Sequence, residues 1–314
     1  MKRKIKQGNT KNITLVVGDM ASCYAQRTLY DHLSENPIFN ISLREEMHAV
    51  SNHNILPSSL LTTEPGFSVG MHHDFPTGKP ANVEIDVAIL KNCAKPYTEA
   101  QKAEIKTKFG IKKDETVITI GYPQTNAQLA KRIFDVFKNT KIFASGTSSC
   151  SFENYMSHVT FTGLGLLKQA YAVADIALDG SCIDTSKNRM HNFVEMTEGG
   201  PLFFVPPTET RQYGYQTFVD IGIMNICKDA EEIIGRIKTY LENTEPDEHV
   251  KKRAEHIQDA REKYLPVIES IILNKLGLAD VIESDLTITE INGCTRILHP
   301  ESNWTDNNVY FDGQ

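Results

Sequence analysis

Residues 115–144, ETVITIGYPQTNAQLAKRIFDVFKNTKIFA, contain the pattern on which the fold prediction depends. The apolar run VITIGY at 117–122 is typical of a strand that is buried on both faces of a parallel sheet. Apolar residues then recur at helical spacing through 126–139, and a second apolar run begins at Lys141. A strand, a helix and another strand in this order predict a parallel βαβ unit.

The same alternation continues to about residue 242. Strands are expected at 117–122, 141–144, 158–162, 175–178, 201–205 and 222–226, with helices at 126–139, 165–174, 191–198, 212–219 and 230–241. This alternation predicts a doubly wound α/β domain, in which ligands bind beyond the carboxyl ends of the strands. Functional residues should therefore lie in the loops that follow the strands.

The segments on either side of this domain are less regular. Before it, we expect strands at 13–17, 67–71 and 83–90 and helices at 25–33 and 98–109. After it, a long helical pattern at 247–276 contains Pro266, whose missing N–H should kink or divide the helix. The tail beyond Gly277 shows little periodicity.

Composition excludes several classes of protein. With 314 residues, 40% hydrophobic and 23% charged, the chain can build a core, and its length suggests about two domains. The net charge of −7 disfavours a nucleic-acid partner, since binding to phosphates needs positive charge. Six dispersed cysteines without a CxxC motif predict free thiols and no cysteine-based zinc site, and the short apolar run after the basic N-terminus predicts no membrane span. We expect a cytoplasmic protein.

The richest candidate site is the stretch 175–207, DIALDGSCIDTSKNRMHNFVEMTEGGPLFFVPP. The unpaired N–H groups of a helix start near His191 can hold a phosphate, and Ser181 and Asn192 would add donors. Because His191 and Glu195 are four residues apart, they share a helix face, where the carboxylate can accept from a ribose diol. The residues can also be merely a helix cap, a surface charge and a glycine helix stop.

This stretch resembles the donor-binding signature of GT-B glycosyltransferases, and most closely that of 3-deoxy-D-manno-octulosonic acid (Kdo) transferases. In that signature a strand leads to a Gly-Gly-Ser loop, a His-Asn-x-x-Glu helix and a Pro-rich strand. The similar segments here are 179–181 (DGS), 191–195 (HNFVE) and 200–206 (GPLFFVP). The resemblance implies an α/β, GT-B-like fold of two Rossmann-like lobes, with the N-terminal lobe reduced.

The resemblance also implies an organisation and an activity. It divides the chain into a small N-terminal acceptor-side lobe at 1–112, a nucleotide-sugar-binding lobe at 113–246, and C-terminal helices and tail at 247–314 that pack across the lobes. The activity would be transfer of a sugar from a nucleotide-sugar donor to a hydroxyl acceptor, without a metal or another cofactor. The donor-binding residues would be Gly121, Tyr122, Asn126, Gly180, Ser181, His191, Asn192 and Glu195.

The catalytic base is the least defined part of this hypothesis. We find no counterpart, before residue 112, of the glutamate-containing catalytic segment of Kdo transferases. Asp19 follows the first strand, where a general base can face the cleft, but an ordinary turn carboxylate also fits. The run 72–74 (HHD) can bind metal or form a polar loop. Two alternative functions remain: a nucleotide-sugar 2-epimerase-like enzyme, and a non-catalytic nucleotide-sugar-binding or regulatory protein.

Overall fold

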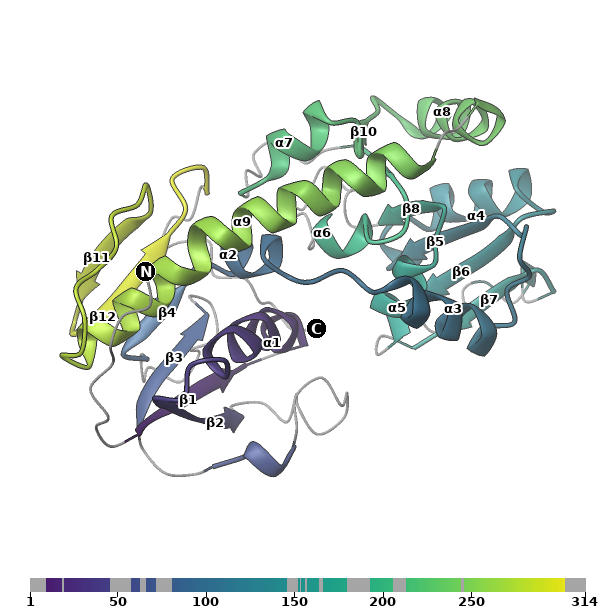
Figure 1. The fold of residues 1–314 in the computed structure, drawn as a ribbon. Coiled ribbons are helices and arrows are strands. Elements are labelled where there is room, and N and C mark those ends of the chain that lie inside the picture. Colours follow the sequence, from purple (N-terminus) through teal and green to yellow (C-terminus); the bar gives the residue numbers. More distant parts are fainter. Residues whose placement is uncertain are drawn as a thin grey trace. The chain divides into compact units, whose positions relative to one another are not determined.

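The computed structural model describes residues 10–18, 20–45, 58–62, 66–71, 81–145, 152, 154–155, 157–163, 166–179, 193–205, 213–243 and 246–302. The chain divides into two compact units. The first unit contains Met1–Lys95 and Ile257–Gln314, and the second contains Pro96–His256. Each unit has its own sheet of six strands (Figure 1).

The sheet of the second unit confirms the predicted alternation. Its strands are β5 (Val117–Gly121), β6 (Lys141–Ser145), β7 (Val159–Thr162), β8 (Ile176–Asp179), β9 (Leu202–Phe204) and β10 (Met224–Ile226). They pair in the order β10-β9-β8-β5-β6-β7, and every pair is parallel. Each predicted strand is present, with ends that differ by no more than two residues.

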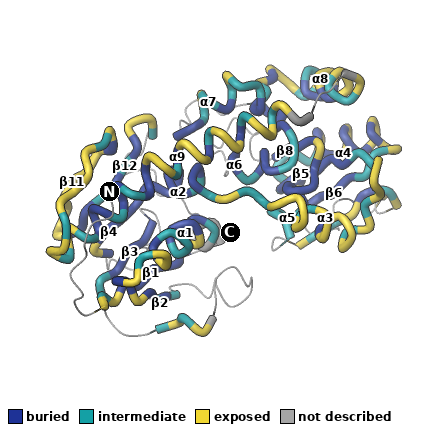
Figure 2. The backbone as a smooth tube through the Cα atoms, viewed as in Figure 1, coloured by how far each residue is buried: buried dark blue, intermediate teal, exposed yellow. Residues whose placement is uncertain are grey.

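Helices cover both faces of this sheet. They are α3 (Glu99–Lys108), η2 (Pro123–Asn126), α4 (Ala127–Val136), α5 (Leu167–Ala172), α6 (Phe193–Met196), α7 (Tyr215–Asp220) and α8 (Ala230–Asn243). Because side chains alternate along a strand, Ile118 and Ile120 of β5 pack in the core formed with α4 and α8, whereas Val117 packs with α5. The strands are therefore buried on both faces, which explains the continuous apolar runs (Figure 2).

The sheet of the first unit has the order β11-β12-β4-β3-β1-β2. Its strands are β1 (Lys11–Val17), β2 (Phe39–Glu45), β3 (Phe67–Met71), β4 (Val83–Ile85), β11 (Thr287–Ile291) and β12 (Cys294–Leu298). Its helices are α1 (Met20–Leu33), η1 (Ser58–Leu60), α2 (Val87–Asn92) and part of α9 (Pro246–Lys275). All pairs are parallel except β11 with β12.

Three features of the first unit differ from the sequence prediction. The predicted strand at 83–90 is instead β4 followed by α2, because the Asp86 carboxylate accepts from the Ala88 N–H at 2.8 Å and caps the helix. The strand β2 was not predicted. The tail beyond Gly277, for which no strand was predicted, contains β11 and β12. A tight turn through Asn292 and Gly293, with φ of 52° and 82°, joins these two strands.

The division into units also differs from the predicted boundaries. The segment from Pro96 belongs to the second unit, where α3 packs against α5. The segment from Ile257 belongs to the first unit, where β12 pairs with β4. The N-terminal segment therefore supplies four strands of the first sheet, and the end of the chain supplies two.

The helix α9 runs through Pro266 without interruption, so of the two predicted effects of this proline, a kink or a division of the helix, the division does not occur. Pro266 leaves the Glu262 carbonyl without its usual helical donor. On both sides of the proline the side chains of Tyr264, Leu265 and Val267 are buried, which holds the helix together despite the missing hydrogen bond. Among the described helices, none is long and apolar enough to cross a membrane.

Candidate functional site

The carboxyl ends of β5 and β8 lie side by side at the centre of the second sheet. Their register pairs Gly121, the last residue of β5, with Asp179, the last residue of β8. The strands β6 and β7 follow β5 towards one edge of the sheet. The chain then returns to the other side of β5, where β8, β9 and β10 follow one another towards the opposite edge. The boundary between β5 and β8 is thus the topological switch point, where open α/β sheets bind ligands.

Gly121 leaves no space for a side chain. A Cβ atom at this position would clash with the hydroxyl oxygen of Tyr171 and lie 3.2 Å from Oδ2 of Asp179. The Tyr171 hydroxyl donates to the Leu178 carbonyl at 3.1 Å and lies 3.4 Å from Oδ2 of Asp179. The two strand ends are therefore connected through Tyr171, which reaches them from α5.

Directly after Gly121 the backbone turns sharply. Tyr122 has a left-handed conformation, with φ of 47° and ψ of 49°, and its N–H donates to the Ser145 carbonyl at 2.8 Å. The chain then enters η2, and Oδ1 of Asn126 accepts from the Leu129 N–H at 3.1 Å as the cap of α4. Asn126 thus has a structural role at the start of α4, whatever ligand contacts it makes.

A small recess lies beside this turn. It is lined by Ile120, Pro123, Asn126, Leu129, Ala130, Ile133 and Leu178. All of these side chains except that of Asn126 are apolar. Since Ile120 and Leu178 are the penultimate residues of β5 and β8, the recess borders the switch point. Its volume is only about 10 Å³, which is room for one water molecule, and most of its lining side chains belong to the buried core between the sheet and α4, so it is a packing void and not a ligand pocket.

Glu195 lies on α6, the next described element of the chain after β8. Its side chain is half-buried. Burial raises the pKa of Tyr97 to about 12, and the carboxylates of Glu198 and Glu195 contribute to this shift. Tyr97 therefore keeps its proton at any physiological pH, and Glu195 lies within electrostatic reach of its hydroxyl.

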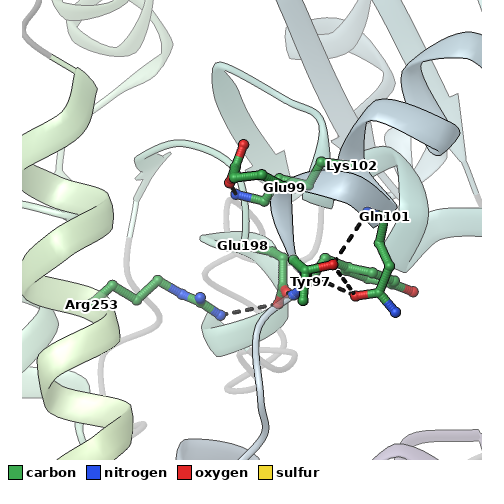
Figure 3. A network of polar contacts seen from close by, with 7 residues as sticks. Tyr97, Glu99, Gln101, Lys102, Glu198 and Arg253 are labelled. Atoms are coloured by element: carbon green, nitrogen blue, oxygen red, sulfur yellow. Dashed lines mark hydrogen bonds and ion pairs between the residues drawn. The ribbon is translucent and has the colours of Figure 1, made fainter.

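Glu198, two residues beyond the end of α6, is a buried carboxylate that the sequence analysis missed. It is 4% exposed, and its Oε2 accepts from Nη2 of Arg253 at 3.1 Å (Figure 3). Its Oε1 accepts from the Tyr97 N–H at 2.5 Å. No sequence signal separates the buried Glu198 from the half-buried Glu195, because both partners of Glu198 are far away along the chain.

Gly199 and Gly200 are more than a helix stop. A Cβ atom on Gly199 would clash with the carbonyl oxygens of Ala174 and Tyr171, and one on Gly200 would clash with the Asp175 carbonyl. Two adjacent residues without side chains are therefore required where α6 leads into β9, because the backbone there lies against the turn between α5 and β8.

Several predicted site residues lie outside the described residues: Asp19, Gly180, Ser181, His191 and Asn192. The run 72–74 does so too. Their proposed roles stay predictions. Of the predicted site, the structure brings Gly121, Tyr122 and Asn126 to the switch point and places Glu195 on α6. Within the described part of the chain, no group of three or more His, Cys, Asp or Glu residues is arranged to hold a metal ion.

Comparisons with known proteins found similarity in structure only. No family model matches the chain, and no curated protein matches it. The S. aureus MnaA structure with UDP has a TM-score of 0.52 and 10% identity, covering 87% of this chain and 100% of that one. A UDP-N-acetylglucosamine 2-epimerase has a TM-score of 0.50 and 11% identity, covering 88% and 100%. The C-terminal CMP-Kdo binding domain of WaaA from Acinetobacter baumannii has a TM-score of 0.38 and 15% identity, covering 51% and 97%.

These similarities define the class of fold. The chain has a GT-B-like fold, with two Rossmann-type units whose sheets are mostly parallel. At identities of 10–11% the similarity concerns the fold and not the reaction. The TM-score of 0.38 with the Kdo-binding domain is too low to support a Kdo transferase in particular. The resemblance is thus confirmed only as far as the GT-B-like fold.

Proposed function

We propose that the chain binds a nucleotide-activated sugar at the switch point of the second sheet and transfers the sugar to a hydroxyl acceptor. The pairing of Gly121 with Asp179 is the observation that supports this most strongly. The two predicted donor-binding segments, which begin at Tyr122 and Gly180, therefore follow strand ends that are paired with each other. Ligands of doubly wound sheets bind at such a position.

The described residues suggest a role for each side of the site. Gly121 and Tyr122 would bring the backbone after β5 towards the phosphates, and the turn that leads to Asn126 would line the same side of the site. Glu195 would accept hydrogen bonds from ribose or sugar hydroxyls. Ser181, His191 and Asn192 would add donors to the phosphates, which stabilise the departing nucleotide in the transition state.

The acceptor side of the reaction depends on the first unit. Transfer to a hydroxyl requires a general base that removes the acceptor proton as the sugar–phosphate bond breaks. Asp19, which follows β1, remains our candidate for this base. No metal or further cofactor is part of the proposal, because hydrogen-bond donors alone can balance the charge of the departing phosphate.

A nucleotide-sugar 2-epimerase is the second candidate function, since it would use the same donor site. Two of the proteins similar in fold are named as UDP-N-acetylglucosamine 2-epimerases. The products separate the two reactions. A transferase attaches the sugar to an acceptor and releases the nucleotide, whereas an epimerase returns an isomeric nucleotide sugar without an acceptor. A non-catalytic binding protein would do neither.

A thermal-shift panel of CMP-, UDP- and GDP-linked sugars tests the donor site. A ligand present at 100 times its Kd should stabilise the protein by about 2.7 kcal/mol. The variant Glu195→Ala should weaken binding of that ligand about tenfold, the usual scale for a hydrogen bond to a charged group. Absence of stabilisation by every member of the panel would show that the donor-site proposal is wrong.

A further inference from the structure

The helix α6, which carries Glu195, is held by contacts on the residues around that carboxylate. The Thr197 hydroxyl donates to the carbonyls of Phe193 and Val194, at 3.1 and 3.2 Å. Glu198 follows one turn after Val194 and is buried by its two partners. Each of these contacts fixes the backbone beside Glu195, while the Glu195 side chain stays half-buried.

Arg253 of α9 donates two hydrogen bonds to this region from a single nitrogen atom. Its Nη2 donates to the Val194 carbonyl at 2.9 Å and to Oε2 of Glu198 at 3.1 Å. Val194 immediately precedes Glu195, and Glu198 lies three residues beyond it. A single guanidinium, itself only 4% exposed, therefore connects the residues on both sides of Glu195.

The other carboxylate oxygen of Glu198 is bound by the segment that leads into α3. Oε1 of Glu198 accepts from the N–H of Tyr97, and Thr98 follows as the N-cap of α3. The Thr98 and Gln101 side chains close a capping box there, with the Gln101 N–H donating to Thr98 Oγ1 at 3.3 Å. Glu198 is thus held between α9 and the start of α3, and α6 is held with it.

Stability alone does not account for this arrangement. A buried ion pair stabilises a protein little compared with apolar side chains of similar size. Here the pair is imperfect as well, because the buried Nε of Arg253 has no hydrogen-bond partner among the residues that the structure describes. What the pair does provide is one defined position for α6, since Nη2 can satisfy both of its acceptors only when Val194 and Glu198 are placed as observed.

We propose that Arg253 is a positioning residue for the nucleotide-sugar site, where it holds α6 so that Glu195 is presented to the ribose or sugar hydroxyls. This inference rests on the proposed function of Glu195. Arg253 itself does not touch the ligand. Its effect on binding should therefore pass entirely through Glu195.

The test is a double-mutant cycle on binding of UDP-N-acetylglucosamine, or of whichever CMP-, UDP- or GDP-linked sugar binds the wild-type chain. Replacing the ion pair by Glu198→Met with Arg253→Met removes both buried charges, so that neither is left unpaired in the folded protein. We expect this replacement to weaken binding about tenfold, as Glu195→Ala does. With all three substitutions the loss should stay near tenfold, whereas independent effects would multiply to about a hundredfold.

Two matched variants complete the design. Arg253→Lys keeps a donor and a charge facing Glu198 and should retain affinity within about threefold. Lys252→Met changes the neighbouring residue, which is 42% exposed and pairs with Glu248 on the surface of α9, and should leave affinity unchanged. Hydrogen exchange without ligand should show faster exchange at 193–200 in the ion-pair replacement and no change in β5.

The outcomes are distinguishable. If the wild type binds none of the probes, or if Glu195→Ala leaves affinity unchanged, the proposed site is wrong and the inference falls with it. If Glu195→Ala weakens binding but the ion-pair replacement does not, or if their effects multiply, only the inference about Arg253 is wrong. Equal and non-multiplying losses, with affinity retained in Arg253→Lys, would support it.

Discussion

Replacing Gly121 by alanine should destabilise the second unit strongly. The added Cβ would overlap the Tyr171 hydroxyl oxygen and lie 3.2 Å from both Cζ of Tyr171 and Oδ2 of Asp179. Moving the ring away breaks the bond to the Leu178 carbonyl and withdraws the hydroxyl from the fully buried Asp179 carboxylate. Overpacking costs about 1–3 kcal/mol and the lost hydrogen bond about 1 kcal/mol more, so we expect a loss of about 2–4 kcal/mol.

Urea unfolding followed by circular dichroism measures this loss, and a double-mutant cycle identifies its cause. Tyr171→Phe removes the overlapping oxygen and should cost about 1–2 kcal/mol alone. In the Tyr171→Phe background Gly121→Ala should add little, because the clash with the hydroxyl oxygen is relieved and its hydrogen bond is already lost. The double variant should therefore cost about 1–2 kcal/mol, which corresponds to a coupling energy of about 2–4 kcal/mol. The control is Gly163→Ala, whose Cβ would meet no atom within 4 Å and should change stability by less than about 0.5 kcal/mol. Equal stability of Gly121→Ala and Gly163→Ala, or strictly additive effects with Tyr171→Phe, would contradict this explanation.

Two further predictions concern a buried histidine and a helix cap. Burial lowers the pKa of His299 to about 4, so the folded state binds this proton more weakly than the unfolded state does. The free energy of unfolding should therefore fall by up to about 3 kcal/mol as the pH drops from about 6.5 to 4. Below about pH 4 this group should cause no further change. Denaturation at several pH values checks this, and His299→Gln should remove that part of the pH dependence; an unchanged slope would exclude His299 as its origin. Asn126→Ala removes the cap of α4 and should cost about 1 kcal/mol, whereas Gln128→Ala, at an exposed position of α4, should cost less; equal effects would argue against the cap.

The second sheet was predictable because each of its strands carries its own signal. Runs such as 117–121 are apolar at every position since both faces of the sheet are covered, and a glycine or proline ends several of them. The first sheet gave weaker signals. The edge strand β2 alternates buried and exposed residues over only seven positions, and β12 pairs with β4, more than two hundred residues earlier in the chain. Short strands with such distant partners are not recognisable from local patterns.

The candidate site was predictable only in part, for a similar reason. The glycine-containing turn after β5 and the carboxylate of Glu195 follow local patterns, and the parallel, doubly wound arrangement of the strands could be inferred from the alternation. The ion pair of Glu198 with Arg253 depends on α9 passing α6, and the clash at Gly121 depends on Tyr171 reaching across from α5. Contacts between such distant segments cannot be predicted from the spacing of residues along the sequence.

Hydrogen–deuterium exchange with and without a nucleotide sugar tests most directly whether the ligand binds at the switch point of the second sheet. With a saturating CMP-, UDP- or GDP-linked sugar, we predict slower exchange in the peptides covering 117–129 and 193–200. The β11–β12 hairpin at 287–298, in the first unit, should exchange at an unchanged rate and serves as the internal reference. Protection confined to segments other than 117–129 and 193–200, or no protection with any of the three nucleotide classes, would contradict the proposed site.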